Sequence, residues 1–113
     1  MKIDLKNQKC QACKGDTPKF DEKQIIKYLS KLDNWSVNEE QKMIFKKLKF
    51  KNFNEALNFT NQVAHLSEEE GHHPDISLGW GYTLIMLHTH SIKGLSLNDF
   101  ILAAKIDTID KIY

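Results

Sequence analysis

The sequence predicts an α+β domain with the element order αββαββα, in which a four-stranded antiparallel sheet carries helices packed on one face. Three segments place apolar residues at helical spacing, and four shorter segments alternate apolar and polar residues as strands do. The strands come in two pairs with short turns, which predicts two hairpins with a helix between them. Hairpins joined in this way form one sheet that the helices cover from a single side.

Each predicted helix begins with a capping pair, in which an acceptor side chain at the N-cap is followed three residues later by a second polar side chain. The pairs are Asp21 with Gln24, Asn52 with Glu55, and Ser96 with Asp99. The first helix is expected over 21–32 and the second over 52–70, where Gly71 suits the left-handed residue that ends a helix. The second helix should bury one apolar stripe, made of Phe53, Ala56, Leu57, Thr60, Val63, Ala64 and Ser67.

Alternating side chains predict the four strands, which are expected at 35–37, 43–50, 76–80 and 82–90. Residues 38–40 form the turn of the first hairpin. In the second hairpin, Ile76, Leu78 and Trp80 alternate, and glycines flank the end of the strand. The last helix then starts at Ser96.

Composition limits the classes of function. A chain of 113 residues with 41% apolar residues can bury one core, and we expect a polar leader over 1–20 and a single domain over 21–113. The formal net charge of +1 argues against a nucleic-acid-binding surface. The longest apolar run, Leu84–Leu87, is far too short to cross a membrane. Because the N-terminus also lacks a signal-peptide core, a cytoplasmic location is expected.

The leader contains the only two cysteines, Cys10 and Cys13, as a lone CxxC. A structural zinc site needs four ligands, and no second cysteine pair follows. A thioredoxin-type motif would begin a helix after a strand, whereas this pair lies in a polar segment. We therefore expect free thiols in a mobile or locally packed leader.

The histidines gather between the second helix and the fourth strand. His72 and His73 follow the predicted helix stop, and His88 and His90 lie two apart near a strand end, so that both should point to one face of the sheet. Imidazole exchanges protons readily near neutral pH and also binds metal ions, so the cluster indicates acid–base chemistry or a metal site. His65, in the middle of a helix, is expected to be structural or solvent-facing.

A spaced set of motifs crosses the same region and extends upstream to Asp33-Asn34-Trp35 and to residues 45–53. Its later members are Glu68, His72-His73-Pro74, Trp80, Thr89-His90, Gly94-Leu95-Ser96 and Asp99. In this order the motifs resemble the signature of the pterin-4a-carbinolamine dehydratase family, whose pattern can be laid on residues 33–107.

The resemblance implies the fold predicted above and a dehydratase that converts 4a-hydroxytetrahydropterin to quinonoid dihydropterin and water, in recycling of tetrahydrobiopterin-type cofactors. It implies no metal and no organic cofactor, and a pterin as the small-molecule substrate. Because family members form tetramers built from dimers, it also implies a homo-oligomer, either a dimer or a tetramer.

The resemblance also implies roles for individual residues. His72 and His90 would form the leading acid–base pair, and His73 would grip the pterin or exchange roles with them. Substrate contacts are implied for Gly71, His72, His73, His88, Thr89, His90 and Ser91. Supporting roles are implied for Glu68, Asp99 and Trp35, the first two orienting imidazoles and the third forming an apolar wall.

Other functions stay open at this point. A metal-binding protein could use His72, His73, His88 and His90. A non-catalytic interaction module is a third reading, since animal members of the family also bind a homeodomain transcription factor. A different pterin substrate is compatible with the same residues, and the sequence leaves open which histidine is the acid and which is the base.

Overall fold

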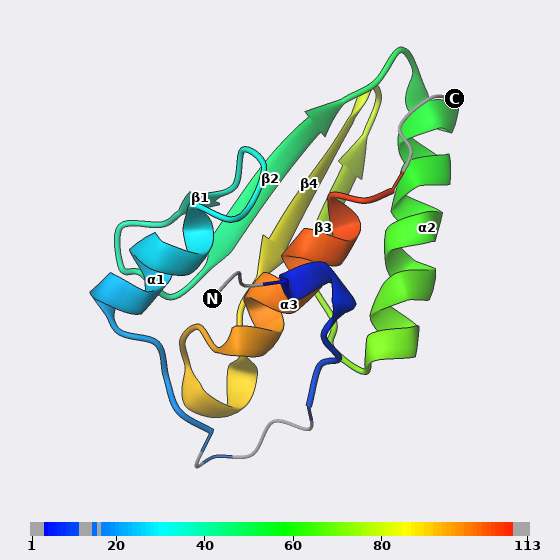
Figure 1. The fold of residues 1–113 in the computed structure, drawn as a ribbon. Helices are drawn as coiled ribbons and strands as arrows, with labels where there is room; N and C mark the ends of the chain where they lie inside the picture. Colours follow the sequence, from blue (N-terminus) through cyan, green and yellow to red (C-terminus); the bar gives the residue numbers. More distant parts are fainter. Residues whose placement is uncertain (1–3, 12–14, 16, 110–113) are drawn as a thin grey trace.

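The computed structural model describes residues 4–11, 15 and 17–109, and it has the predicted α+β architecture (Figure 1). The sheet is antiparallel with the strand order β1-β2-β4-β3. Along the chain the elements are η1 (Leu5–Asn7), α1 (Glu22–Leu29), β1 (Ser36–Val37), β2 (Ile44–Lys49), α2 (Phe53–Glu70), β3 (Asp75–Gly79), β4 (Tyr82–Leu87), η2 (His90–Ile92) and α3 (Leu97–Ile106). The predicted fold class is confirmed.

One face of the sheet is buried beneath the helices, which all lie on the same side of it (Figure 1). The buried side chains of the two central strands alternate with more exposed ones, as expected for a half-covered sheet. They are Ile44, Lys46 and Leu48 on β2 and Thr83, Ile85 and Leu87 on β4. The α1 helix joins this core through α3, because the rings of Phe20 and Tyr28 lie 5.4 and 5.8 Å from that of Phe100.

The predicted stripe of α2 is only partly right. The helix buries four residues, namely Ala56, Phe59, Val63 and Ser67. Phe59 was missing from the prediction, whereas Phe53 is 45% exposed and Ala64 points to solvent. Ala64 follows Val63 by one residue, about 100° around the helix, and so it cannot share the narrow face that meets the sheet. His65 is exposed, as predicted.

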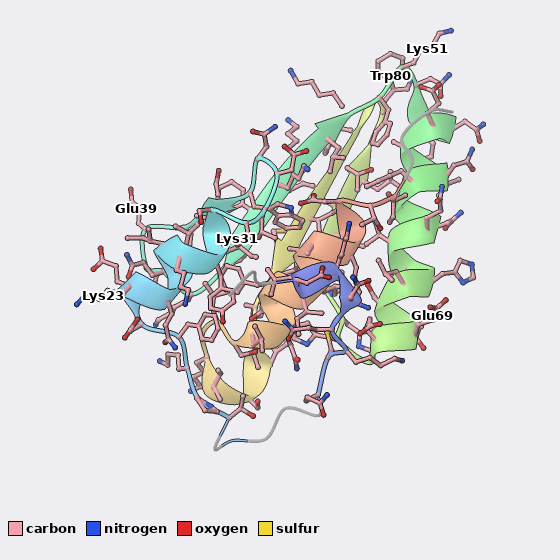
Figure 2. The ribbon with its side chains drawn as sticks, in the orientation of Figure 1. Lys23, Lys31, Glu39, Lys51, Glu69 and Trp80 are labelled. Carbon is pink, nitrogen blue, oxygen red and sulfur yellow. The ribbon has the colours of Figure 1, made fainter. Side chains whose placement is uncertain are left out.

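In the second hairpin, both strands end before the residue that the sequence suggested. Its turn consists of Trp80 and Gly81, with Gly81 at a φ of +78°, so Trp80 lies in the turn and is 72% exposed. Figure 2 shows Trp80 beside Lys51 at one end of the molecule and Glu69 near the other end of α2. The fourth strand ends at Leu87 and not at His90, because the chain turns back and Thr89 N–H donates to the Gly94 carbonyl at 2.8 Å.

The described part of the leader packs on the domain. Leu5 is buried in the core, and the amide side chain of Asn98 exchanges hydrogen bonds with the backbone of Gln11, at 2.9 and 2.6 Å. Cys10 is half-buried as a free thiol, whereas Cys13 lies outside the described residues. Within the described residues, no helix is both long and apolar enough to cross a membrane.

Candidate active site

The end of α2 and the segment after β4 meet at an open hollow of about 330 Å³. Its lining residues are Gly71, His72, His73, Pro74, Asp75, His88, Thr89, His90 and Ser91. The helix stops here because Gly71 adopts a left-handed φ of +64°, and the N–H groups of Gly71 and His72 donate to carbonyls of the last turn. The turn sends His72 inward and leaves His73 exposed.

His72 is the buried histidine of the site, only 8% exposed. Its Nε2 lies 2.7 Å from Oδ1 of Asp99, whose carboxylate is completely buried. The other oxygen, Oδ2, accepts hydrogen bonds from the Thr89 hydroxyl at 2.8 Å and from the Ser96 N–H at 3.0 Å. Asp99 therefore caps α3 and holds the imidazole at the same time. Because the carboxylate contacts Nε2, Nδ1 is the ring nitrogen of His72 that remains for another partner.

Two further histidine–carboxylate pairs lie at the rim and are more open to solvent. His73 Nε2 lies 2.5 Å from Glu68 Oε1, with both side chains exposed. His88 Nε2 lies 2.9 Å from Asp75 Oδ2. His90, the first residue of η2, is exposed, and its ring lies edge-on to that of His88 with centroids 4.1 Å apart. The rim therefore offers imidazoles that can change partner without unpacking the core.

The structure brings together the residues predicted from the sequence, with one exception. All seven predicted substrate contacts line the hollow, and Glu68 and Asp99 contact His73 and His72 as expected of orienting groups. Trp35 does not line the hollow. It is buried in the core, where its Nε1 donates to Asp107 Oδ1 at 2.9 Å, beside the ammonium of the buried Lys46.

Sequence reasoning missed Asp75, Ser96 and the hydroxyl of Thr89 as members of these networks. Asp75 pairs with Met86 across the sheet, and side chains two residues apart on a strand share a face, so the register brings Asp75 to His88. Alternation along one strand does not give this register, so the sequence pattern alone was not sufficient to identify Asp75. Nothing in the sequence pattern pointed to the bond of 2.8 Å between the hydroxyls of Thr89 and Ser96.

One group of side chains in the described ranges could hold a metal ion, and it differs from the predicted set. Asp75, His88 and His90 place one ligand atom each within 4.8 Å of one another. His72 and His73 are not part of this group, and their Nε2 atoms contact Asp99 and Glu68 instead. The four-histidine metal site considered from the sequence is thus not assembled.

A buried ion pair anchors the leader next to the hollow. Glu70, the residue before Gly71, lies 3.1 Å from Lys105 Nζ and accepts from the Cys10 N–H at 2.9 Å. Burial opposes ionisation of Glu70, but the Cys10 N–H and the Lys105 ammonium outweigh it and lower its pKa below 4.5. Burial, helped by the charge of Glu70, raises the pKa of Cys10 to about 12. Cys10 is therefore a packed, neutral thiol and not a nucleophile.

Comparisons of this chain with known proteins all point to one family. The model of the Pterin 4 alpha carbinolamine dehydratase family matches residues 18–109. Two relatives are provisionally named pterin-4-alpha-carbinolamine dehydratases. The one from Halorhodospira halophila is 42% identical, and the match covers 95% of this chain and 98% of the relative. The one from Rickettsia canadensis is 46% identical, and the match covers 92% of this chain and 95% of the relative.

Solved structures agree with this result. A transcriptional coactivator/pterin dehydratase from Brucella melitensis superposes with a TM-score of 0.75 at 29% identity, over 80% of this chain and 96% of that one. A pterin dehydratase-like protein, described as a RuBisCO assembly factor in the alpha-carboxysome, gives a TM-score of 0.57 at 30% identity, over 66% and 87%. On this evidence the chain belongs to the pterin-4-alpha-carbinolamine dehydratase family.

Proposed function

We propose that this protein dehydrates 4a-hydroxytetrahydropterins by histidine acid–base catalysis and so supports recycling of tetrahydrobiopterin-type cofactors. The observation that carries the proposal is that His72, held by the buried Asp99, lines one hollow together with exposed imidazoles, in a chain of this family. The reaction needs no change of oxidation state. The N5 proton and the 4a-hydroxyl leave together as water, and a C4a–N5 double bond forms.

The two proton transfers need one group that accepts and one that donates, each contributing about 10²–10⁴-fold in rate. His72 suits one role because Asp99 fixes its ring and stabilises the imidazolium that forms when Nδ1 takes a proton. His90 suits the other because it is exposed and lines the same hollow. Which of the two acts on N5 depends on the face of the pterin that carries the hydroxyl.

The remaining groups bind the substrate in this proposal. His73, paired with Glu68, contacts the pterin from the exposed side of the hollow. Backbone groups of Gly71–His73 and His88–Ser91 meet the polar edge of the flat ring system, which offers several donors and acceptors. A hollow of about 330 Å³ lies at the small end of the usual range for ligand sites and suits a bicyclic ring with its side chain in solvent.

We also propose that the protein assembles into a dimer or tetramer. Both outer strands of the four-stranded sheet, β1 and β3, have one neighbouring strand, so each leaves one edge without a strand partner. Pairing between copies would cover such an edge. Light scattering at micromolar concentration should therefore give a mass of two or four chains, and a monomer would refute this part of the proposal.

Stopped-flow dehydration of freshly generated 4a-hydroxytetrahydropterin tests the function directly. Addition of the protein at catalytic concentration should accelerate the formation of quinonoid dihydropterin over the spontaneous reaction. If the two rates are equal, the dehydratase proposal fails, and a role without catalysis would have to explain the conserved architecture of the fold.

A further inference from the structure

We propose that Asp75, His88 and His90 bind a divalent transition-metal ion, with Zn²⁺ as the probe, and that the bound ion inhibits the enzyme by occupying His90. The site lies apart from the His72–Asp99 pair but shares His90 with the proposed reaction, and the ion would regulate the reaction without taking part in it. The inhibitory consequence rests on the proposed dehydratase function, whereas metal binding itself does not.

The geometry is close to that of a three-ligand metal site. The ligand atoms of Asp75, His88 and His90 lie within 4.8 Å of one another, and His88 Nε2 is 2.9 Å from Asp75 Oδ2. Zinc binds imidazole nitrogen and carboxylate oxygen at about 2.0–2.2 Å, which places tetrahedral ligands about 3.3–3.6 Å apart. The widest separation must therefore close by no more than about 1.5 Å.

The side chains that must move are the ones free to do so. His90 and Asp75 are exposed, and His88 is only partly buried, so rotamer changes disturb no core packing. The backbone, in contrast, already holds the three residues close to one another. Asp75 starts β3 opposite Met86, His88 follows β4 by one residue, and His90 begins η2. The sheet register thus joins ligands that are 13 residues apart in sequence.

The local charge and the donor set also favour a metal cation. Among the residues that the structure describes, no lysine lines the hollow, so none of their ammonium groups competes for the Asp75 carboxylate there. Two imidazoles and one carboxylate suit borderline ions such as Zn²⁺, Co²⁺ or Ni²⁺, whereas Mg²⁺ and Ca²⁺ prefer oxygen ligands alone. Three protein ligands at an open rim leave a coordination position for water. We therefore expect one ion per chain, bound at micromolar concentration.

Inhibition follows from the shared ligand. An imidazole that coordinates a metal ion uses the lone pair that would accept a proton, so His90 cannot serve as an acid or base while the ion is bound. His72 keeps its contact with Asp99 and does not take part in the metal site. A chelator should consequently raise the activity of metal-loaded protein, the opposite of its effect on a metalloenzyme.

Metal binding is tested by titrating chelator-treated full-length protein with Zn²⁺ in competition with a chromophoric chelator. Wild-type protein should bind one ion per chain, and Asp75→Asn and His88→Ala should each weaken binding at least tenfold. His65→Ala is the matched control, since it removes an exposed imidazole on α2 outside the cluster. Substitution by Co²⁺ should give visible d–d bands that Asp75→Asn abolishes.

Three results would overturn the site: no stoichiometric binding by wild type, Asp75→Asn and His88→Ala both binding like wild type, or His65→Ala weakening binding as much as they do. Circular dichroism of each variant checks that the fold is retained. In the stopped-flow assay, Zn²⁺ should inhibit wild type, and Asp75→Asn should raise the Zn²⁺ concentration for half-inhibition at least tenfold. Binding without inhibition would overturn the regulatory role alone, and absence of dehydratase activity would leave the binding result intact.

Discussion

Two neighbouring histidines of the hollow, His72 and His73, are each paired with a carboxylate, but in two different environments. His72 and Asp99 are buried and tied to a hydroxyl and a backbone N–H, whereas His73 and Glu68 are exposed. An exposed pair contributes about 0–1 kcal/mol to stability, since water competes for both groups. Breaking a buried pair instead leaves an unsatisfied charge. Burial, and not the pairing itself, therefore decides which histidine is held rigidly.

Asp99→Asn should give the largest loss of stability among substitutions at the site. Aspartate has two acceptor oxygens, whereas asparagine has one. The Ser96 N–H at the start of α3 and the His72 imidazole would therefore compete for that single oxygen. We expect a loss of about 2–4 kcal/mol from the cap and the unsatisfied buried group together. Urea denaturation measures the loss of unfolding free energy, and Glu68→Gln is the matched change in the exposed pair. Equal losses in the two variants would mean that burial does not distinguish the pairs.

Glu70→Gln should have the next largest effect and should depend on pH. The Glu70 side chain is 4% exposed and paired with Lys105, so we expect a loss of about 1–3 kcal/mol at pH 7. Because the folded-state pKa lies below 4.5, this contribution is present above that pH and is lost as pH falls through the lowered pKa.

Urea midpoints of wild type and Glu70→Gln at neutral and acidic pH test this sign. The gap between the two proteins should shrink as the pH falls below 4.5. Glu69→Gln is the control, because Glu69 points away from the molecule at the same end of α2 (Figure 2). A gap that is independent of pH would show that the ionised carboxylate is not the source of the stability.

His73→Ala should have the smallest effect on stability, within about 0.5 kcal/mol, because its pair with Glu68 is exposed. If His73 grips the pterin, the same change should raise KM several-fold while leaving kcat nearly unchanged. Steady-state kinetics with a urea titration separate the two effects. A drop in kcat comparable to that of the acid–base pair would move His73 into the chemistry.

The sequence alone could predict the fold class because capping pairs and alternation agree with each other along most of the chain. The capping box of α1 and the left-handed Gly71 were visible as residue types, and the structure has both. Trp80 and the end of β4 could not be placed correctly, because a tight turn and a backbone bridge set those boundaries, and not periodicity.

The sequence could predict which histidines belong to the site better than which side chains they contact. Two histidines follow the end of a helix, and His90 follows the end of a strand. These two chain segments converge once the sheet forms. Asp75 needed the register of β3 on β4, which spacing along the chain does not give. From the sequence pattern, Trp35 could belong to either the core or the pocket, and its burial in the core, with a bond to Asp107, shows that it is a core residue here.

The most direct measurement is the stopped-flow dehydration rate of His72→Ala, His90→Ala and His65→Ala at equal enzyme concentration, in the presence of chelator and under conditions where circular dichroism shows each to be folded. His72→Ala and His90→Ala should each lower the dehydration rate at least tenfold, because each removes a proton-transfer group. His65→Ala should have the same rate as wild type. If His72 and His90 can both be replaced without loss of rate, the proposed mechanism is wrong.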